Sequence, residues 1–523
     1  MSLPFKSHRT TLSLLLLVGA ITPALAQPAA IHLGAAPNQD VLTLPPDSID
    51  AALADLPDHI SAVMARSGAP GVAVAVVHGG ETIYAQGFGV RERGKDALID
   101  ADTVFQIASV SKPLAATVAA IQVAAGIVDW DDLAQQYLPD LALGDPAVSA
   151  MTTIGDLYAH RTGLPMAAGD DLEDFGFSRD DIVARLRHLP LDAFRTSYHY
   201  ANFGITTGAE AVAAASGLPW EDLAEQALYQ PLGMTATSSR YADFLARDNR
   251  AALHVLQDGT FQPLYQRDAD AQSPAGGVSS SVNDLAKWLQ LLLAMGEHDG
   301  GALFTPQAML PALSPQAFSG RPHAVDARPG FYGYGFNVGV NTSGRTAFNH
   351  SGAFTLGAGT HIQFIPSADI AIVVLTNGGP IGLAEGIAFQ FMDIVQYGSP
   401  TRDWFAAFNG VMAHYYDPVG DLAGQKPPAD PAPAQALADY AGSYANDYFG
   451  PILITADADG LQLSIGPRGD SFRLQHWQGD VFAMTPSSEN APKDSRSSVI
   501  FDRAAGTVHI DYLDANGLAT WTR

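Results

Sequence analysis

The sequence contains no cysteine, and this absence excludes disulfide bonds, thiolate metal sites and a cysteine nucleophile. Basic residues are also scarce, with 28 Lys and Arg against 54 Asp and Glu, so that the formal net charge is −26. Nucleic acids and anionic membranes are bound through clustered Lys and Arg, and we expect neither as a partner. The 523 residues are 47% hydrophobic, which excludes a largely disordered chain and suffices for about two to four domains.

Several motifs that would place the chain in other enzyme classes are missing as well. We find no G-x-S-x-G, H-E-x-x-H or Walker sequence, and no G-x-G-x-x-G after a predicted strand. The 15 histidines show no spacing that is typical of zinc ligands. The sequence therefore predicts neither a metal site nor a bound cofactor.

The first 26 residues have the three parts of a secretory signal peptide. Lys6 and Arg9 make a basic start, residues 12–21 are largely apolar, and Ala24-Leu-Ala26 is a cleavage pattern of small residues. An uncleaved membrane anchor is the alternative, but the apolar run is shorter than the ~20 residues that a bilayer span needs. We expect a periplasmic or secreted protein with no membrane attachment after cleavage.

Apolar patterning predicts a mixed α/β region with strands at both ends and helices between them. β-Branched runs separated by short turns indicate two strand pairs, and 3.6-residue periodicity indicates helices. The predicted strands are 71–77, 82–88, 360–365 and 370–376, and the predicted helices are 49–67, 114–125 and 382–395. We expect an antiparallel sheet with flanking helices and an inserted helical subdomain within residues 127–330.

A proline-rich segment separates this region from a C-terminal part with a different pattern. Residues 425–433 are typical of an extended linker, and the short alternating strands after it predict an all-β barrel. Because such a linker is exposed, we expect few contacts to cross it. The predicted parts are a signal peptide (1–26), an N-terminal arm (27–48), a catalytic domain (49–398), a helix and linker (399–435) and a small barrel (436–523).

One candidate nucleophile stands out. The chain has six lysines, and only Lys112 has a serine three positions before it. That serine is Ser109, so residues 109–112 are an S-x-x-K sequence. An extended stretch changes to a helix at this point, so the two side chains share a face. A desolvated lysine can serve as the base that activates a serine, and a helix N-terminus offers free N–H groups for an oxyanion. The alternative is a capping serine beside a surface lysine.

Two later segments add to this motif in a fixed order. Tyr200-Ala-Asn202 is a Y-x-N sequence, and His350-Ser351-Gly352 is an H-x-G sequence. Together with S-x-x-K they resemble the serine β-lactamase and penicillin-binding-protein family, in the branch of class C β-lactamases, D-amino-acid-specific peptidases and related esterases. The resemblance covers roughly residues 50 to 395 and implies the β-lactamase/transpeptidase-like fold. The part from Tyr440 onward is similar to small β-domains appended to such enzymes.

The resemblance implies a role for each of these residues. Ser109 would be the acylated nucleophile, Lys112 would take its proton, and Tyr200 would be a second acid/base, deprotonated through Lys112. The substrate would be bound by five residues: Asn202, His350, Ser351, Gly352 and Ala353. The N–H groups of Ser109 and Ala353 would form the oxyanion hole.

The third motif departs from the family pattern, since many members have Lys-Thr/Ser-Gly where this chain has His350. Histidine has an ordinary pKa near 6.5, so we expect His350 to gain charge only as the pH falls from 8 to 6. This weakens the case for β-lactam hydrolysis. We expect a peptidase acting on small or unusual peptides, such as those that contain D-amino acids, with a carboxylesterase as the alternative, then a β-lactamase or penicillin-binding protein, and last a non-enzymatic peptide binder. The expected partner is a small peptide or ester substrate.

Overall fold

The computed structural model describes residues 43–523. The predicted signal peptide and most of the predicted N-terminal arm lie outside the described residues. Across the described range, no helix combines the length and the apolar character that a bilayer span requires.

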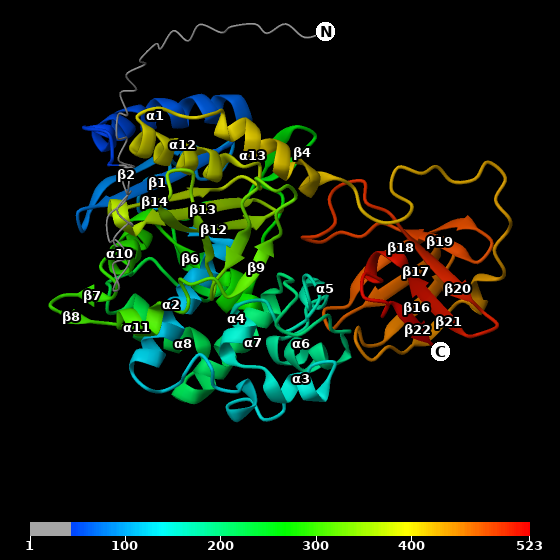
Figure 1. The fold of residues 1–523 in the computed structure, drawn as a ribbon. Coiled ribbons are helices and arrows are strands. Elements are labelled where there is room, and N and C mark those ends of the chain that lie inside the picture. Colours follow the sequence, from blue (N-terminus) through cyan, green and yellow to red (C-terminus); the bar gives the residue numbers. More distant parts are fainter. Residues whose placement is uncertain (1–42) are drawn as a thin grey trace, which may run out of the picture. The chain divides into compact units, whose positions relative to one another are not determined.

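An eight-stranded antiparallel sheet forms the centre of the larger part (Figure 1). Its order is β2-β1-β14-β13-β12-β11-β10-β9. The strands are β1 (Gly71–His78), β2 (Glu81–Gly89), β9 (Ala317–Gly320), β10 (Gly330–Tyr332), β11 (Asn337–Val340), β12 (Thr346–Phe354), β13 (Ala358–Ile365) and β14 (Ile370–Thr376). The predicted antiparallel sheet is confirmed, and strands from both ends of the region are neighbours in it.

Helices cover both faces of this sheet, which explains why its central strands are apolar throughout. One layer holds α1 (Ser48–Ser67), α12 (Leu383–Tyr397) and α13 (Trp404–Met412) (Figure 1). The side chains of Val72, Val74 and Val76 belong to the apolar cluster under that layer. Ala73, Ala75 and Val77 belong to a second cluster on the opposite face, because successive residues of a strand point to opposite sides.

The opposite face carries α2 (Ser111–Ala124) and α10 (Val282–Leu293), and beyond them the inserted helices. Those helices are α3 (Pro146–Met151), α4 (Ile154–Tyr158), α5 (Asp170–Asp174), α6 (Arg179–Arg185), α7 (Asn202–Ser216), α8 (Trp220–Ala224), α9 (Tyr241–Ala246) and α11 (Pro306–Met309). Nearly all of α2 is buried, so this helix is packed on every side between the sheet and the inserted helices.

Three short strand pairs complete this part. They are β3 (Phe105–Gln106) with β6 (Ser279–Ser280), β4 (Val255–Gln257) with β5 (Thr260–Gln262), and β7 (Glu297–His298) with β8 (Gly301–Ala302). The β3–β6 pair matters for the site, because β3 ends just before Ser109.

A second eight-stranded antiparallel sheet forms the C-terminal part, with its strands in sequence order. They are β15 (Gly442–Tyr444), β16 (Ile452–Asp457), β17 (Gly460–Ile465), β18 (Asp470–Gln478), β19 (Val481–Met484), β20 (Ser497–Asp502), β21 (Thr507–Ile510) and β22 (Thr520–Thr522). A bridge between Ala445 and Thr522 joins the first and last strands, so the sheet is a nearly closed barrel, as predicted.

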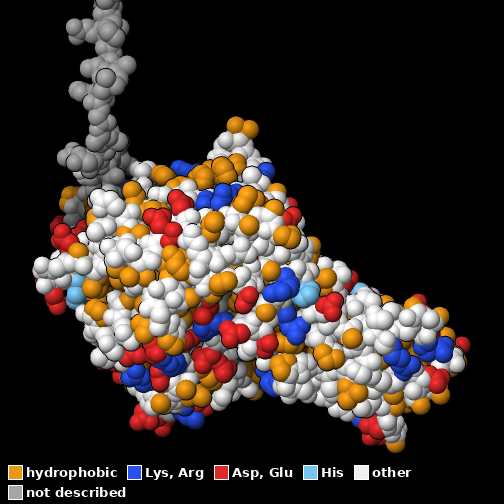
Figure 2. All heavy atoms as spheres, turned by 90° about the horizontal axis from the view of Figure 1, so that it is seen from below, with side chains coloured by type: hydrophobic (Ala, Val, Ile, Leu, Met, Phe, Trp, Pro, Cys, Tyr) orange, Lys and Arg blue, Asp and Glu red, His pale blue; other side chains and the backbone are white. Residues whose placement is uncertain are grey.

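Acidic and basic side chains are interspersed over the face drawn in Figure 2. Close ion pairs occur in the structure: the Arg179 guanidinium lies 2.6 Å from the carboxylates of both Glu210 and Glu221. Although acidic residues dominate the composition, several of them therefore have local cationic partners.

The barrel packs on the inserted helices, and the expectation of few contacts across the linker is wrong. Tyr448 donates to Asp171 at 2.9 Å, and Arg185 donates to the carbonyl oxygens of Asp447 and Tyr448 at 2.7 and 2.8 Å. Phe175 meets Phe472 within an apolar cluster that includes residues of both parts. A proline-rich sequence indicates only that the linker itself is extended and exposed. It does not indicate whether the two domains that it joins pack on each other.

Ending the chain at Ala429 tests this packing. We expect the truncated protein to bind a dye specific for exposed apolar surface and to melt at least about 5 °C below the full chain, because part of a shared apolar cluster loses its cover. The full chain with Arg185→Ala should show a smaller decrease. A truncated protein with the same Tm and no dye binding would contradict the shared core.

Candidate active site

A short turn at the start of α2 carries Ser109. The 3-10 turn η1 (Ala108–Val110) precedes α2 directly, and within it only Ser109 is partly exposed. Ala108 has φ +47°, a left-handed conformation that is costly for a residue with a side chain. The Ser111 hydroxyl supports it by donating to Ala108 O at 2.6 Å and accepting from Val278 N–H at 3.1 Å. Packing and these two hydrogen bonds therefore fix the position of the Ser109 side chain.

Lys112 is fully buried directly beneath Ser109. Its ammonium donates to Ser109 Oγ at 2.9 Å, to Asn202 Oδ1 at 2.7 Å and to Ala275 O at 2.8 Å. Burial lowers the pKa of Lys112 from 10.5 to about 7, an effect that the charge of Asp170 opposes in part. Near neutral pH a substantial fraction is thus the free amine, which can accept the proton of Ser109.

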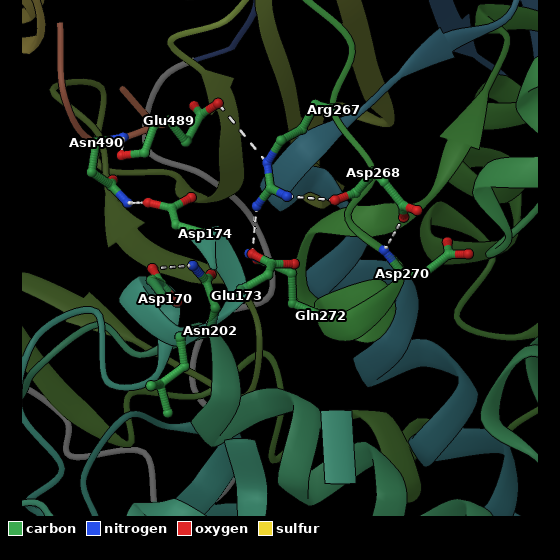
Figure 3. Close-up of polar contacts among 12 residues, drawn as sticks. Asp170, Glu173, Asp174, Asn202, Arg267, Asp268, Asp270, Gln272, Glu489 and Asn490 are labelled. Carbon is green, nitrogen blue, oxygen red and sulfur yellow. Dashed lines mark hydrogen bonds and ion pairs between the residues drawn. The ribbon is translucent and has the colours of Figure 1, made fainter. Parts of the chain in front are cut away.

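Asp170 orients Asn202, the first residue of α7. The Asn202 amide nitrogen donates to Asp170 Oδ2 at 2.8 Å (Figure 3), which turns the amide oxygen toward Lys112. Burial, followed by the charge of Glu173, raises the pKa of Asp170 well above its usual range. Sequence reasoning missed Asp170; a run of acidic residues that continues through 174 was the available signal.

Tyr200 lies against both Ser109 and Lys112. The Lys112 nitrogen is 4.5 Å from the centre of the Tyr200 ring, and the phenol shares a hydrogen bond with the Ser109 side chain. Burial raises the pKa of Tyr200 well above 10. The phenol therefore keeps its proton, contrary to the deprotonated state that the resemblance implied, and of the two groups Lys112 is the better base.

His350 lies on the opposite wall as a neutral imidazole. Its Nδ1 donates to Ser351 O at 2.6 Å, so Nε2 is free to accept from the Tyr332 hydroxyl at 2.9 Å. Burial, together with the nearby charge of Lys112, lowers the pKa of His350 to about 3. The expectation that His350 becomes charged between pH 8 and 6 is therefore wrong. The error arose because the sequence did not reveal its burial.

The strand that carries His350 passes close to the turn of Ser109. A Cβ at Gly352 would lie 2.9 Å from Ser109 N and 2.3 Å from Ile107 O, so only glycine permits this approach. Strand β11 pairs with β12 only as far as Asn349, and β12 continues past that point with β13 as its partner. The part of β12 that includes Ala353 therefore has no hydrogen bonds to β11.

Ser351 points away from Ser109, onto the face that α12 covers. Its hydroxyl bonds to His361 Nδ1 at 2.9 Å, and the His361 ring packs on Phe389 of α12. Strand alternation places the His350 side chain on the other face, and a Cβ at Gly352 would point the same way, toward Ser109 N. The structure thus brings together Ser109, Lys112, Tyr200, Asn202, His350, Gly352 and the backbone of Ala353, but not the Ser351 side chain.

Tyr332 and His160 are further residues of this wall that the sequence did not assign. The His160 ring lies 4.6 Å from that of Tyr200 and 5.0 Å from that of Tyr332. His160 Nδ1 accepts from Ala201 N–H at 3.2 Å, which fixes the backbone between Tyr200 and Asn202. Both residues lie within the range 50 to 395 that resembles the family, but no residue pattern indicated what they touch.

The assembled groups can carry out acyl transfer. They comprise a serine hydroxyl, an amine with a pKa near neutrality, a protonated phenol and backbone N–H groups at the start of a helix. Among residues 43–523 there is no group of three or more His, Asp or Glu residues placed to hold a metal ion.

Comparison with known proteins gives matches over both parts of the chain. Residues 56–390 match the family model described as Beta-lactamase, and residues 426–514 match a model described as Domain of unknown function (DUF3471). The chain is 25% identical to Unguisins hydrolase ungD of Aspergillus violaceofuscus, over 80% of each chain. It is 26% identical to Penicillin-binding protein 4 of Amycolatopsis lactamdurans, over 75% of this chain and 97% of the other.

The fold resembles that of the octameric penicillin-binding protein homologue from Pyrococcus abyssi. The TM-score is 0.58 and the identity 18%, over 88% of this chain and 98% of that one. At this identity the likeness concerns the fold alone.

The lowered pKa of Lys112 predicts the pH dependence of acylation. Because the free amine is the reactive form, the acylation rate with p-nitrophenyl butyrate should rise about tenfold between pH 6 and pH 8. Lys112→Arg should lose about 10³-fold, since a guanidinium stays protonated. The matched control is Lys287→Arg, at an exposed lysine paired with Asp284, which should keep the wild-type rate. A flat profile from pH 6 to 8 would contradict the role of Lys112.

Proposed function

This chain belongs to the Beta-lactamase family, and we propose that it is an exported serine peptidase that cleaves small peptides, including peptides with D-amino acids, through an acyl-enzyme on Ser109. The observation that carries the proposal is the hydrogen bond from the buried Lys112 to Ser109. A lysine that only capped a surface helix would be solvated and would keep its ordinary pKa.

In the proposed reaction, the free amine of Lys112 takes the proton of Ser109 as Oγ attacks the substrate carbonyl. The N–H groups of Ser109 and Ala353 donate to the oxyanion. When the C–N bond breaks, the leaving nitrogen receives a proton from the Tyr200 phenol, which Lys112 then reprotonates. Water then takes the place of the leaving amine and attacks the carbonyl of the acyl-enzyme. The proton transfers run in the opposite direction, so that Ser109 is freed and the acid is released.

The neutral state of His350 supports a peptidase over a β-lactamase. A β-lactam carries a carboxylate, and a cation opposite the serine would bind it by a charge-assisted hydrogen bond. His350 instead accepts from Tyr332 and has a pKa of about 3, so it offers no such cation. Relatives named hydrolase, penicillin-binding protein and Beta-lactamase are all among the matches, and all three names fit acyl-enzyme chemistry.

A carboxylesterase is the second candidate. An alkoxide leaving group depends less on a proton donor than an amine does, so an ester can react even if Tyr200 holds its proton tightly. Purified protein should be tested on D- and L-amino-acid amides, linear peptides, p-nitrophenyl esters and nitrocefin. The proposal expects a higher kcat/KM for an amide or peptide than for nitrocefin. Hydrolysis of esters alone would favour the esterase.

Ser109→Ala should abolish turnover, with a loss of about 10³-fold or more and an unchanged fold by circular dichroism. A fluorophosphonate should label the wild type at Ser109 and leave the variant unlabelled. Ser61→Ala, at an exposed position of α1, is the control and should keep full activity. Failure of the probe to label Ser109 in the wild type would instead favour a peptide binder.

A further inference from the structure

A loop of the C-terminal barrel places Glu489 against the end of strand β12. The Glu489 carboxylate accepts from Thr355 N–H, and its Oε1 lies 3.1 Å from Thr355 Oγ1. The Thr355 hydroxyl also meets the Glu489 carbonyl. Thr355 follows the last residue of β12 and comes two residues after Ala353. Glu489 of the barrel thus contacts the chain directly after β12, the strand that carries His350 and Ala353.

Arg267 faces the same carboxylate (Figure 3). Its Nε is 3.9 Å from Glu489 Oε2, while its Nη2 pairs with Glu173. The guanidinium lies 5.3 Å from the centre of the Phe354 ring, so it packs on the end of β12. Arg267 Nε and Glu489 Oε2 are both buried without a hydrogen bond. Arg267 therefore retains a donor that a better placed anion could use.

These groups form a set of donors suited to a carboxylate: a backbone N–H, a hydroxyl and a guanidinium. A cavity of about 820 Å³ adjoins them, lined by Thr355, Arg267, Glu173 and residues 485–489 and 491–496. Burial raises the pKa of Glu489 to about 7, which means that burying its ionised carboxylate in this position costs free energy. The arrangement offers both room and hydrogen bonds to a ligand that would displace Glu489.

The distance from the nucleophile fits a substrate group. Gly352 lies against Ser109 N, and Thr355 is three residues further along, or about 10 Å at the rise of a β-strand. A substrate whose carbonyl reaches Ser109 and whose chain follows the edge of β12 would bring its next polar group to Thr355.

We propose that Thr355 and Arg267 form a carboxylate-binding subsite of the cleft, and that Glu489 of the barrel fills it, so that the enzyme selects substrates without a carboxylate at that point. The inference rests on the proposed acyl-enzyme chemistry of Ser109. It assigns to the C-terminal domain, whose family model carries no function, the role of limiting which substrates bind.

Glu489→Ala tests the subsite with p-nitrophenyl monoesters of succinic, adipic and suberic acid against p-nitrophenyl butyrate. The variant should have a kcat/KM for the adipate and suberate monoesters that is about tenfold or more higher relative to butyrate. The reason is that the substrate carboxylate can then accept charge-assisted hydrogen bonds from the donors that Glu489 occupied. The succinate monoester is too short and should gain little. Thr355→Val in the Glu489→Ala background should reduce the gain.

Two matched variants separate an emptied subsite from a loosened loop. Glu489→Gln keeps the space filled and should leave the substrate preference within about threefold of wild type. Asn490→Ala removes the neighbouring contact to Asp174 (3.0 Å) and should also leave it unchanged. Equal gains in Glu489→Ala and Asn490→Ala would overturn the proposal, and so would an unchanged ratio of anionic to neutral ester in Glu489→Ala.

A binding measurement keeps this test independent of catalysis. In the Ser109→Ala background, adipate should raise the Tm of the Glu489→Ala protein and leave that of the protein with Glu489 unchanged. If the wild type hydrolyses no ester or amide, the proposed function fails, while this Tm shift still decides whether the subsite exists. No shift in the Glu489→Ala protein would overturn the subsite.

Discussion

The burial of one ammonium group, that of Lys112, is the constraint on which the rest of the site depends. A buried cation must have its donors satisfied, and here three acceptors from three separate segments meet it: Ser109, Asn202 and Ala275. Those segments belong to the turn before α2, the start of α7 and the segment before β6. The sheet, the inserted helices and the β3–β6 pair must all be in place for Lys112 to be both buried and hydrogen-bonded.

The same burial sets the chemistry of the neighbours. With its pKa near 7, Lys112 supplies the base, so Tyr200 is free to remain a phenol and to act as an acid. The partial charge on Lys112 also helps to keep His350 neutral. Asp170 counteracts the desolvation of Lys112 from the far side of Asn202. The site thus combines four titratable groups whose protonation states depend on one another.

Much of this could be predicted from the sequence, for identifiable reasons. The strands at 71–77 and 370–376 are uninterrupted apolar runs rich in β-branched residues, so their local sequence is enough to predict them. Ser109 and Lys112 are three residues apart at the start of a helix, so their contact could also be predicted from local sequence. Strands β9 to β11 are short, with an irregular pairing, and no local pattern indicated them. The orientation of Ser351 depended on which face of β12 meets Ser109, and the charge of His350 depended on its burial, so both required tertiary structure.

The packing of the barrel also lay beyond sequence reasoning, because Glu489 and Thr355 are separated by 134 residues and share no motif. The most direct measurement of the central claim is an NMR titration of ¹³C-labelled lysine side chains. The chain has six lysines, so the spectrum is simple, and the signal that disappears in Lys112→Arg identifies Lys112. The account predicts that this signal titrates near pH 7. A Lys112 signal that titrates near pH 10, with the lysines of the surface, would contradict it.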